Sequence, residues 1–260
     1  MDGKLEFLKE VSNGAGKILM GYFGKPFEIK GKAGSELVTT ADIKSEEFII
    51  TALRRKYPDI GVIAEESNSR EWEKKEVFIV DPLDGTHNFA YGIPFFSISI
   101  AYKINREIIL GIVYDPIHKE LFSCIKGSGA WLNEEQIKVS DRENLNDSIL
   151  ATGFPYIRED IKDSNIPEFS KFLMRTRGLR RLGSAALDLA YVACGRLDGF
   201  WEKHLKLWDI SAGGLLVLEA GGRVSNFYNN DWDDRKDNIV ASNGKIHREM
   251  IKIIKGVHQG

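Results

Sequence analysis

The sequence predicts a mixed α/β protein of two halves, each with its own sheet layered against helices. Three observations predict this class. An amphipathic helical pattern opens the chain, short apolar runs separated by Gly, Pro, Asn and Asp follow it, and helices alternate with short strands in the second half. The pattern of predicted helices and strands changes near residues 141–148, and this boundary divides the chain into residues 1–145 and 146–260. A length of 260 residues suits two such halves packed as one compact unit.

Two helices and five strands are predicted for the first half. Apolar residues recur at three- and four-residue steps over residues 5–22, which predicts the first helix. A second helix begins at Asp42, with two preceding threonines as capping residues, and ends before Pro58. Hairpin-like breaks within residues 93–139 favour antiparallel pairing there. The apolar runs predict strands at residues 60–64, 77–80, 95–102, 108–114 and 120–124.

The second half alternates helices with short strands. Its predicted helices lie at residues 167–177, 185–194, 210–220 and 246–255. Its predicted strands lie at residues 199–201, 222–224 and 239–241. We expect the functional site where the sheets and helix starts of the two halves meet, because ligand sites favour such interfaces.

The composition excludes several functional classes. The 36 basic and 38 acidic residues give a formal net charge of −2, which is too balanced for a general nucleic-acid or membrane-surface binder. No run reaches the roughly 18 apolar residues of a membrane span and no signal peptide opens the chain, so we expect a soluble cytoplasmic protein. Cys124 and Cys194 lie far apart, which predicts free buried thiols and neither a disulfide framework nor a zinc site. One basic run predicts a solvated face, a dimer contact or a partner-binding face: Arg175, Arg177, Arg180 and Arg181.

The most informative stretch starts at residue 80 and reads Val-Asp-Pro-Leu-Asp-Gly-Thr-His-Asn-Phe. An apolar strand delivers Asp81 to its end, and Pro82 stiffens the following turn so that Asp81 and Asp84 converge. Gly85 allows close backbone approach, which leaves its amide and that of Thr86 free to hold an anion. Two carboxylates beside such a turn suit hard divalent cations that bridge to phosphate oxygens. The alternative is a simple Asp-Gly turn with capping aspartates.

Two further acidic features strengthen this interpretation. Glu65 and Glu66 stand where a predicted strand ends, although adjacent glutamates are also typical of a solvated loop. Asp209 opens an apolar helix, where it is a natural N-cap whose second oxygen is free to turn toward a metal. The chain has no zinc-like cluster of His and Cys, no Gly-x-Ser-x-Gly elbow and no Walker A loop. Hydrolysis by metal-activated water is the chemistry that remains.

These motifs resemble those of the inositol monophosphatase family, within the lithium-sensitive, magnesium-dependent phosphatase superfamily that includes fructose-1,6-bisphosphatases. The family's first motif is similar to residues 81–89 and its second to residues 208–213. Residues 37–42 and 64–67 also match in order and spacing, and residues 199–202 look like the bacterial members. The resemblance extends from about residue 4 to residue 255. It implies the family's layered αβαβα sandwich, usually as a homodimer.

The resemblance also implies roles for the matching residues. Two or three Mg²⁺ ions would be held by oxygen atoms of Glu65, Asp81, Leu83 (through its carbonyl), Asp84 and Asp209. The attacking water would be oriented and deprotonated by Asp42 and Thr86, with Glu65 as a third catalytic residue. The substrate would be bound by Asp84, Gly85, Thr86, Gly183, Ser184, Ala185 and Glu202. The alternatives are a helix cap for Asp42 and a packed hydroxyl for Thr86.

The implied activity is hydrolysis of a phosphate monoester of a small polyol or sugar, most directly myo-inositol 1-phosphate, without a phosphoenzyme. Fructose-1,6-bisphosphatase or another sugar or nucleotide phosphatase activity stays open, because these motifs are shared. Lys203, His204 and Lys206 add positive charge near the substrate end and leave room for a second anion. The alternative from a different class is a partner-binding role in transcription or ribosomal RNA biogenesis, for which the face at residues 175–181 is the candidate surface.

Overall fold

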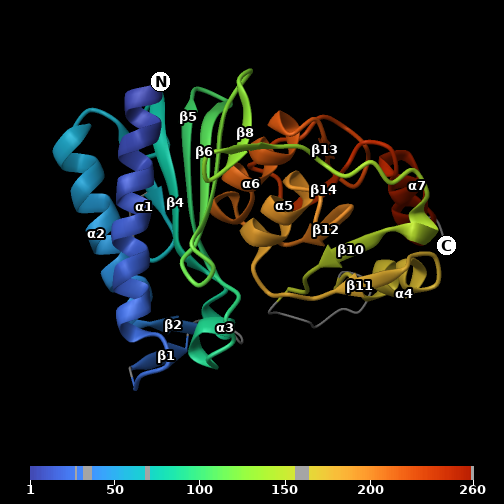
Figure 1. Ribbon diagram of the computed structural model, residues 1–260, viewed down its shortest axis with the longest axis horizontal. Coiled ribbons are helices and arrows are strands. Elements are labelled where there is room, and N and C mark those ends of the chain that lie inside the picture. The colour runs from blue at the N-terminus through green and yellow to red at the C-terminus, as the bar shows by residue number, and fades with distance from the viewer. Residues whose placement is uncertain (27, 32–36, 68–70, 156–163, 259–260) are drawn as a thin grey trace.

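The helices and sheets stack as five alternating layers (Figure 1). The computed structural model describes residues 1–26, 28–31, 37–67, 71–155 and 164–258. One outer layer contains α1 (Asp2–Tyr22) and α2 (Thr40–Lys56), and the central layer contains α5 (Ala185–Ala193) and α6 (Leu207–Glu219). The other outer layer contains α4 (Ile166–Leu173) and α7 (His247–His258). Two sheets separate the three helix layers, which confirms the predicted αβαβα sandwich.

The first sheet has seven strands in the order β3-β4-β5-β6-β7-β8-β9. Only β3 and β4 are parallel, and every other neighbouring pair is antiparallel, as the hairpin-like breaks predict. The strands are β3 (Gly61–Ala64), β4 (Glu76–Asp84), β5 (Ser97–Ile104), β6 (Glu107–Asp115), β7 (Glu120–Ile125), β8 (Gly129–Leu132) and β9 (Glu135–Ile137). β4 continues four residues past the predicted strand at residues 77–80, and these four residues belong to the candidate site.

The second sheet has the order β11-β10-β12-β14-β13. β10 is parallel to both of its neighbours, and the remaining pairs are antiparallel. The strands are β10 (Ile149–Thr152), β11 (Gly178–Arg180), β12 (Gly199–Lys203), β13 (Arg223–Ser225) and β14 (Asn238–Ser242). The short elements outside the two large sheets are β1 (Ile29–Gly31), β2 (Leu37–Thr39), α3 (Thr86–Ala90) and the 3₁₀ turn η1 (Leu145–Asp147).

The predicted helix at residues 167–177 is too long. α4 ends at Leu173, because the Arg177 N–H donates to the carbonyl of Ser148 (3.0 Å) and the chain then enters β11. The close packing predicted for the glycine-rich helix is correct. A Cβ atom on Gly213 of α6 would lie 2.6 Å from Cβ of Leu189 on α5, so the glycine lets the two central helices approach each other.

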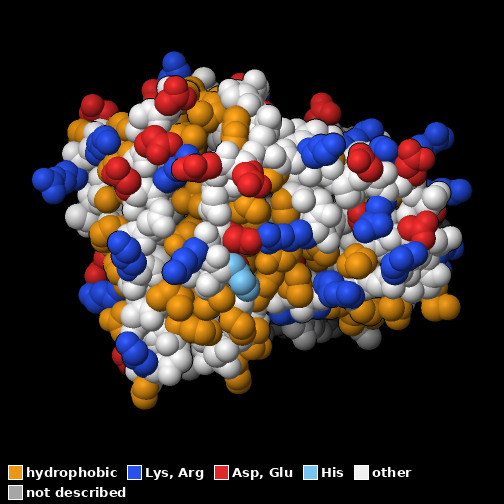
Figure 2. Space-filling view, viewed as in Figure 1, with side chains coloured by type: hydrophobic (Ala, Val, Ile, Leu, Met, Phe, Trp, Pro, Cys, Tyr) orange, Lys and Arg blue, Asp and Glu red, His pale blue; other side chains and the backbone are white. Residues whose placement is uncertain are grey.

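Most residues of the two central helices are apolar and buried, because a sheet covers each side of this helix layer. Both cysteines are free, with Cys124 buried and Cys194 half-buried. Basic and acidic side chains are interspersed on the face seen in Figure 2, in keeping with the balanced net charge. Within the described ranges, no helix combines the length and the apolar character needed to cross a bilayer.

Candidate active site

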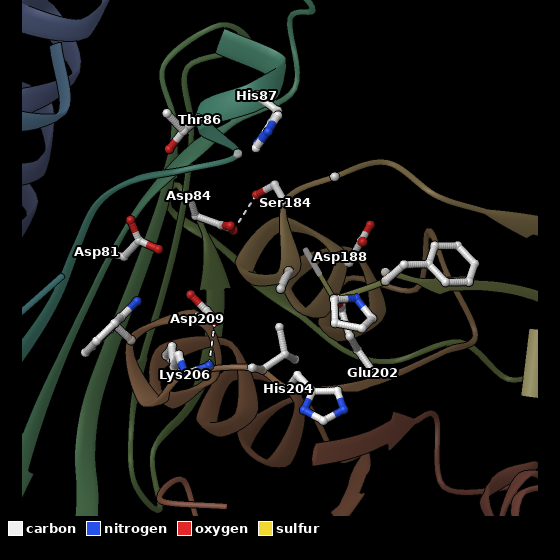
Figure 3. A pocket seen from close by; sticks show the side chains of 18 of the residues that line it. Asp81, Asp84, Thr86, His87, Ser184, Asp188, Glu202, His204, Lys206 and Asp209 are labelled. Atoms are coloured by element: carbon white, nitrogen blue, oxygen red, sulfur yellow. Dashed lines mark hydrogen bonds between the residues drawn. The ribbon is translucent and has the colours of Figure 1, made fainter. Parts of the chain in front are cut away.

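A cavity of about 490 Å³ is lined by residues from two separate stretches of the chain, within residues 37–87 and 152–209. It lies where β4, α3 and the first turns of α5 and α6 come together, with the end of β12 on the far side (Figure 3). The predicted site residues that line it are Glu65, Asp81, Leu83, Asp84, Gly85, Thr86, Gly183, Ser184, Ala185, Glu202 and Asp209. Asp42 lies behind this wall and reaches it through Thr86. The structure therefore brings all the predicted site residues together.

A β-bulge brings the two aspartates of the first motif together. Asp81 of β4 pairs with Ser99 of β5, and Asp84 pairs with Ser97, so three steps along β4 match two along β5. In a regular strand, residues three apart face opposite sides, whereas the extra residue of a bulge turns both toward one side. The predicted geometry is therefore corrected: the strand does not stop at Val80, and convergence comes from a bulge inside β4.

Two serines of β5 hold the central helices against this bulge. Ser99, which pairs with Asp81, donates from Oγ to the carbonyl of Trp208 (3.1 Å), next to Asp209. Ser97, which pairs with Asp84, lies 3.3 Å from the hydroxyl of Ser184. Sequence reasoning did not identify either serine, although their alternation along β5 places both on the face that meets α5 and α6.

Asp209 is the third residue inside its helix and not the N-cap. α6 begins at Leu207, and the Lys206 N–H donates to Asp209 Oδ2 at 2.6 Å. The carboxylate thus satisfies an orphan amide at the start of the helix with one oxygen. The predicted N-cap position was wrong by three residues, and the proximity of Asp209 to the aspartates of β4 was correct.

Four carboxyl groups influence one another electrostatically. Burial raises the pKa of Asp81 well above its usual range, and Glu65, Asp84 and Asp209 raise it further. Burial likewise raises the pKa of Asp209, with contributions from Asp84 and Glu65. The pKa of Asp84 rises to about 6, because burial outweighs the hydrogen bonds that it accepts from the Ser184 hydroxyl (2.6 Å) and the Ala186 N–H (2.7 Å). A cation among these groups would remove the repulsion.

The Gly85-Thr86 turn requires a glycine. Gly85 has φ of 97°, and a Cβ there would lie 3.2 Å from the carbonyl oxygens of Phe95 and Gly183. Thr86 then begins α3, with its Oγ1 3.0 Å from Asp42 Oδ1 and 3.1 Å from the Leu83 carbonyl oxygen. This turn brings the backbone of residues 85 and 86 to the cavity wall.

Asp42 is buried in the first turn of α2. Its Oδ2 accepts from the N–H (2.8 Å) and hydroxyl (2.5 Å) of Thr39, the N-cap residue, and its Oδ1 faces Thr86. Burial raises the pKa of Asp42, against the opposing hydrogen bonds from Thr39 and Thr86. The capping role that was the alternative for Asp42 is therefore real, and it leaves one oxygen for Thr86.

The far end of the cavity is formed by the start of α5 and the end of β12. Ser184 is the N-cap of α5, with its hydroxyl 3.4 Å from the Leu187 N–H. Glu202 is buried, and burial raises its pKa to about 8. The backbone of Gly153 lies directly against this carboxyl group, so that a Cβ at Gly153 would overlap both oxygens.

The three basic side chains predicted near the substrate end do not all reach the cavity. His204 and Lys206 line the cavity, whereas buried Lys203 forms an ion pair with Glu168 (3.1 Å). Lys203 is therefore committed to the fold, which corrects the expectation that it adds charge to the site.

Sequence reasoning also missed Arg181 and Asp188 as cavity residues. Asp188 sits in a run of apolar residues in α5, so the signal was a single carboxylate in an otherwise buried helix.

The αβαβα fold and its acidic cavity define a class of hydrolases that act on phosphate esters. The model of the inositol monophosphatase family matches residues 3–259, and the chain belongs to that family. It is therefore a phosphoric monoester hydrolase, from a family that uses divalent metal ions and acts on phosphorylated polyols.

Relatives of the chain carry two kinds of name. An inositol-1-monophosphatase from a Synechocystis species is 42% identical over 258 residues, covering 98% of this chain and 90% of that protein. A protein named Nus factor SuhB from Haemophilus influenzae is 42% identical over 225 residues, covering 86% of this chain and 84% of that protein. The crystal structure of the extragenic suppressor protein suhB from Bartonella henselae has a TM-score of 0.93 and 39% identity, covering 97% of this chain and 98% of that chain.

Proposed function

We propose that this protein hydrolyses myo-inositol 1-phosphate, or a closely similar polyol monophosphate, by attack of an activated water without a phosphoenzyme. The observation that carries the proposal is the gathering of Glu65, Asp81, Asp84 and Asp209 beside the Gly85-Thr86 turn. The nearest hydroxyl groups serve other purposes, since Ser184 Oγ donates to Asp84 and Thr86 Oγ1 contacts Asp42. The carboxylates are better placed to bind cations than to attack phosphorus.

The donor atoms fit magnesium. All are oxygens, from the four carboxylates and the Leu83 carbonyl, and oxygen ligands suit Mg²⁺ better than Zn²⁺. We propose that Glu65, Asp81 and the Leu83 carbonyl hold one ion, that Asp81, Asp84 and Asp209 hold a second, and that Glu65 takes part in a weaker third. These carboxylates line one cavity, but among the described residues no three His, Cys, Asp or Glu side chains already lie close enough together to hold one ion, so the carboxylates would have to turn toward it. When bound, the ions would lower the pKa of water and offset the charge of the phosphate.

The remaining residues have complementary roles in this proposal. Asp42 accepts a hydrogen bond from the Thr86 hydroxyl, which leaves a lone pair of Thr86 Oγ1 for the attacking water. As the water attacks, its proton passes to Thr86 Oγ1 and the Thr86 proton passes to Asp42, with Glu65 as a third residue beside the water. The amides of Gly85 and Thr86, beside Asp84, bind phosphate oxygens. Gly183, Ser184, Ala185 and Glu202 contact the alcohol part.

A phosphate-release assay over inositol, sugar and nucleotide monophosphates, with fructose 1,6-bisphosphate included, tests this proposal. Myo-inositol 1-phosphate should give the highest kcat/KM, and Asp81→Asn should be inactive on every substrate. A much higher kcat/KM for fructose 1,6-bisphosphate, or for a nucleotide, would assign the protein to the corresponding branch of the superfamily.

A second candidate function is supported by the relatives named Nus factor SuhB. We propose that the exposed arginines 175, 177, 180 and 181 would form the partner surface for a role in transcription or ribosomal RNA biogenesis. Arg177 already pairs with Asp147 at 2.8 Å, so the other three are the better candidates. A pull-down with the unaltered protein should enrich transcription factors or RNA, and a variant with Arg175, Arg180 and Arg181 changed to Glu should not. Equal recovery with both proteins would contradict this surface.

We also propose a cytoplasmic homodimer that is sensitive to lithium. The balanced charge and the two free cysteines support a reducing compartment. Lithium would compete for an all-oxygen cation site because it is a small hard cation. Sedimentation equilibrium tests the dimer, and inhibition of phosphate release by LiCl but not by NaCl tests the lithium sensitivity.

A further inference from the structure

Asp188 is a buried carboxyl group at the cavity wall whose polar contacts are incomplete. It lies in the first turns of α5 and is 1% exposed. Its Oδ1 has no hydrogen-bond partner among the described residues. Buried polar groups are nearly always hydrogen-bonded, and leaving one unsatisfied destabilises the folded protein. An unsatisfied oxygen in a cavity wall therefore indicates a group that a ligand completes.

Charged groups from both ends of the cavity influence Asp188, since Glu202 and Asp84 both raise its pKa. Asp188 and Glu202 lie across the cavity from Asp81 (Figure 3). Burial and the nearby Glu202 are the two largest causes that raise the pKa of Asp188, and Arg181 opposes them. Arg181 also opposes the rise in the pKa of Glu202. The far end thus holds two buried carboxyl groups and one exposed guanidinium.

A purely structural role does not account for Asp188. Asp198 is equally buried and provides the comparison, since its Oδ1 accepts from Ser140 Oγ (2.5 Å) and its Oδ2 from the Ile149 N–H (2.7 Å). Asp198 therefore connects segments of the fold, whereas Asp188 accepts no hydrogen bond at its buried oxygen. A carboxyl group that only filled space in α5 would be replaced to advantage by an apolar residue.

We propose that Asp188 is a specificity-determining residue that accepts a hydrogen bond from a hydroxyl group on the alcohol part of the substrate, beside Glu202. The two carboxyl groups come from α5 and β12 and together suit an alcohol with at least two free hydroxyls. The proposal rests on the proposed polyol phosphatase activity and adds the residue that selects the polyol.

The test compares Asp188→Ala and Asp188→Asn with the unaltered protein on two substrates in Mg²⁺. Myo-inositol 1-phosphate offers hydroxyls, and p-nitrophenyl phosphate offers none. Asp188→Ala should raise KM for the inositol ester at least about tenfold and change kcat/KM for the aryl ester by less than about twofold. Asp188→Asn should keep or raise the melting temperature, because no hydrogen bond to Oδ1 is lost and burial already disfavours the charged carboxylate. The control Asp198→Asn should lower the melting temperature, because Asp198 accepts hydrogen bonds with both oxygens.

Each other outcome has a definite meaning. Equal losses on both esters, unchanged KM for the inositol ester, or a fall of several degrees in melting temperature for Asp188→Asn would overturn the role of Asp188. In those cases the unaltered protein still hydrolyses both esters, so the proposed function stands. Failure of the unaltered protein to release phosphate from either ester would overturn the proposed function and the role of Asp188 together.

Discussion

Thr86 Oγ1 lies 3.0 Å from Asp42 Oδ1, which joins the first residue of α3 to the first turn of α2 across 44 positions of the chain. The other carboxylate oxygen of Asp42 is held by the backbone and hydroxyl of Thr39. The aspartate is therefore fixed from one side and presents its free oxygen to Thr86. The α2 helix cap thereby sets the position of a hydroxyl group in the cavity wall.

Removal of the Thr86 hydroxyl should impair turnover without unfolding the protein. Thr86→Val keeps the side-chain shape and should lower kcat by about a hundredfold, equivalent to about 3 kcal/mol in the barrier. Thr86→Ser retains the hydroxyl and should stay within about tenfold of the unaltered protein. Steady-state kinetics on myo-inositol 1-phosphate measure both variants. Equal rates for Thr86→Val and Thr86→Ser would show that Thr86 serves packing alone.

Gly153 should control the position of Glu202. In Gly153→Ala the new methyl group overlaps the Glu202 carboxyl, so that flexible side chain has to move. We expect at least about a tenfold loss in kcat/KM for polyol phosphates and a smaller loss for an aryl phosphate. Gly21→Ala is the matched control, since a Cβ there meets no atom within 4 Å. A Gly153→Ala protein with unchanged preference would remove Glu202 from the substrate contacts.

The first motif was predictable because local chemistry determines most of it. Pro82 restricts the backbone, and Gly85 permits a conformation that other residues rarely adopt. Asp81 and Asp84 place two carboxylates directly after an apolar run. The bulge was not predictable, because it depends on how β4 pairs with β5. The position of Asp209 in its helix also depended on a contact, the hydrogen bond from the Lys206 N–H. Short-range patterns therefore predicted which residues meet but not the geometry that brings them together.

The missed elements share a physical cause. β10 and β11 have four and three residues, and they become strands through parallel pairing with distant partners. Sequence periodicity carries little information over so few residues. Asp188 was missed because a carboxylate near the start of a helix is ordinarily explained by the helix dipole. The apolar residues around Asp188 were a weak signal, and its position in the cavity wall distinguishes it from an ordinary helix-start residue.

His247 should make stability depend on pH. It is buried between the hydroxyls of Ser225 and Ser242, and burial, helped by Arg223, lowers its pKa from 6.5 to about 4. The neutral imidazole is favoured in the folded state, so its contribution is complete above pH 6.5 and is lost as the pH falls toward 4. The loss amounts to about 3 kcal/mol. Urea unfolding at several pH values should give a steeper acid loss for the unaltered protein than for His247→Gln. Parallel curves would refute this role.

The Lys103–Asp234 ion pair should stabilise the contact between β5 and the segment before β14. The lysine Nζ lies 2.6 and 2.8 Å from the two carboxylate oxygens, and Ser211 Oγ of α6 donates to one of them (3.1 Å). Lys103→Met leaves a buried carboxylate unpaired and should lower the free energy of unfolding by about 3 kcal/mol. Adding Asp234→Asn to Lys103→Met should recover at least half of that loss. A double variant as unstable as the sum of the two single variants would contradict a direct pairing.

Dependence of turnover on a bound divalent cation tests the central claim most directly. Protein stripped by excess chelator and supplied with myo-inositol 1-phosphate should release no phosphate, and Mg²⁺ added above the chelator should restore full activity. Asp84→Asn should stay at least about a hundredfold below the unaltered protein at saturating Mg²⁺, because one carboxylate ligand is lost. Unchanged phosphate release in excess chelator would contradict the assignment of these carboxylates to catalysis through a bound cation.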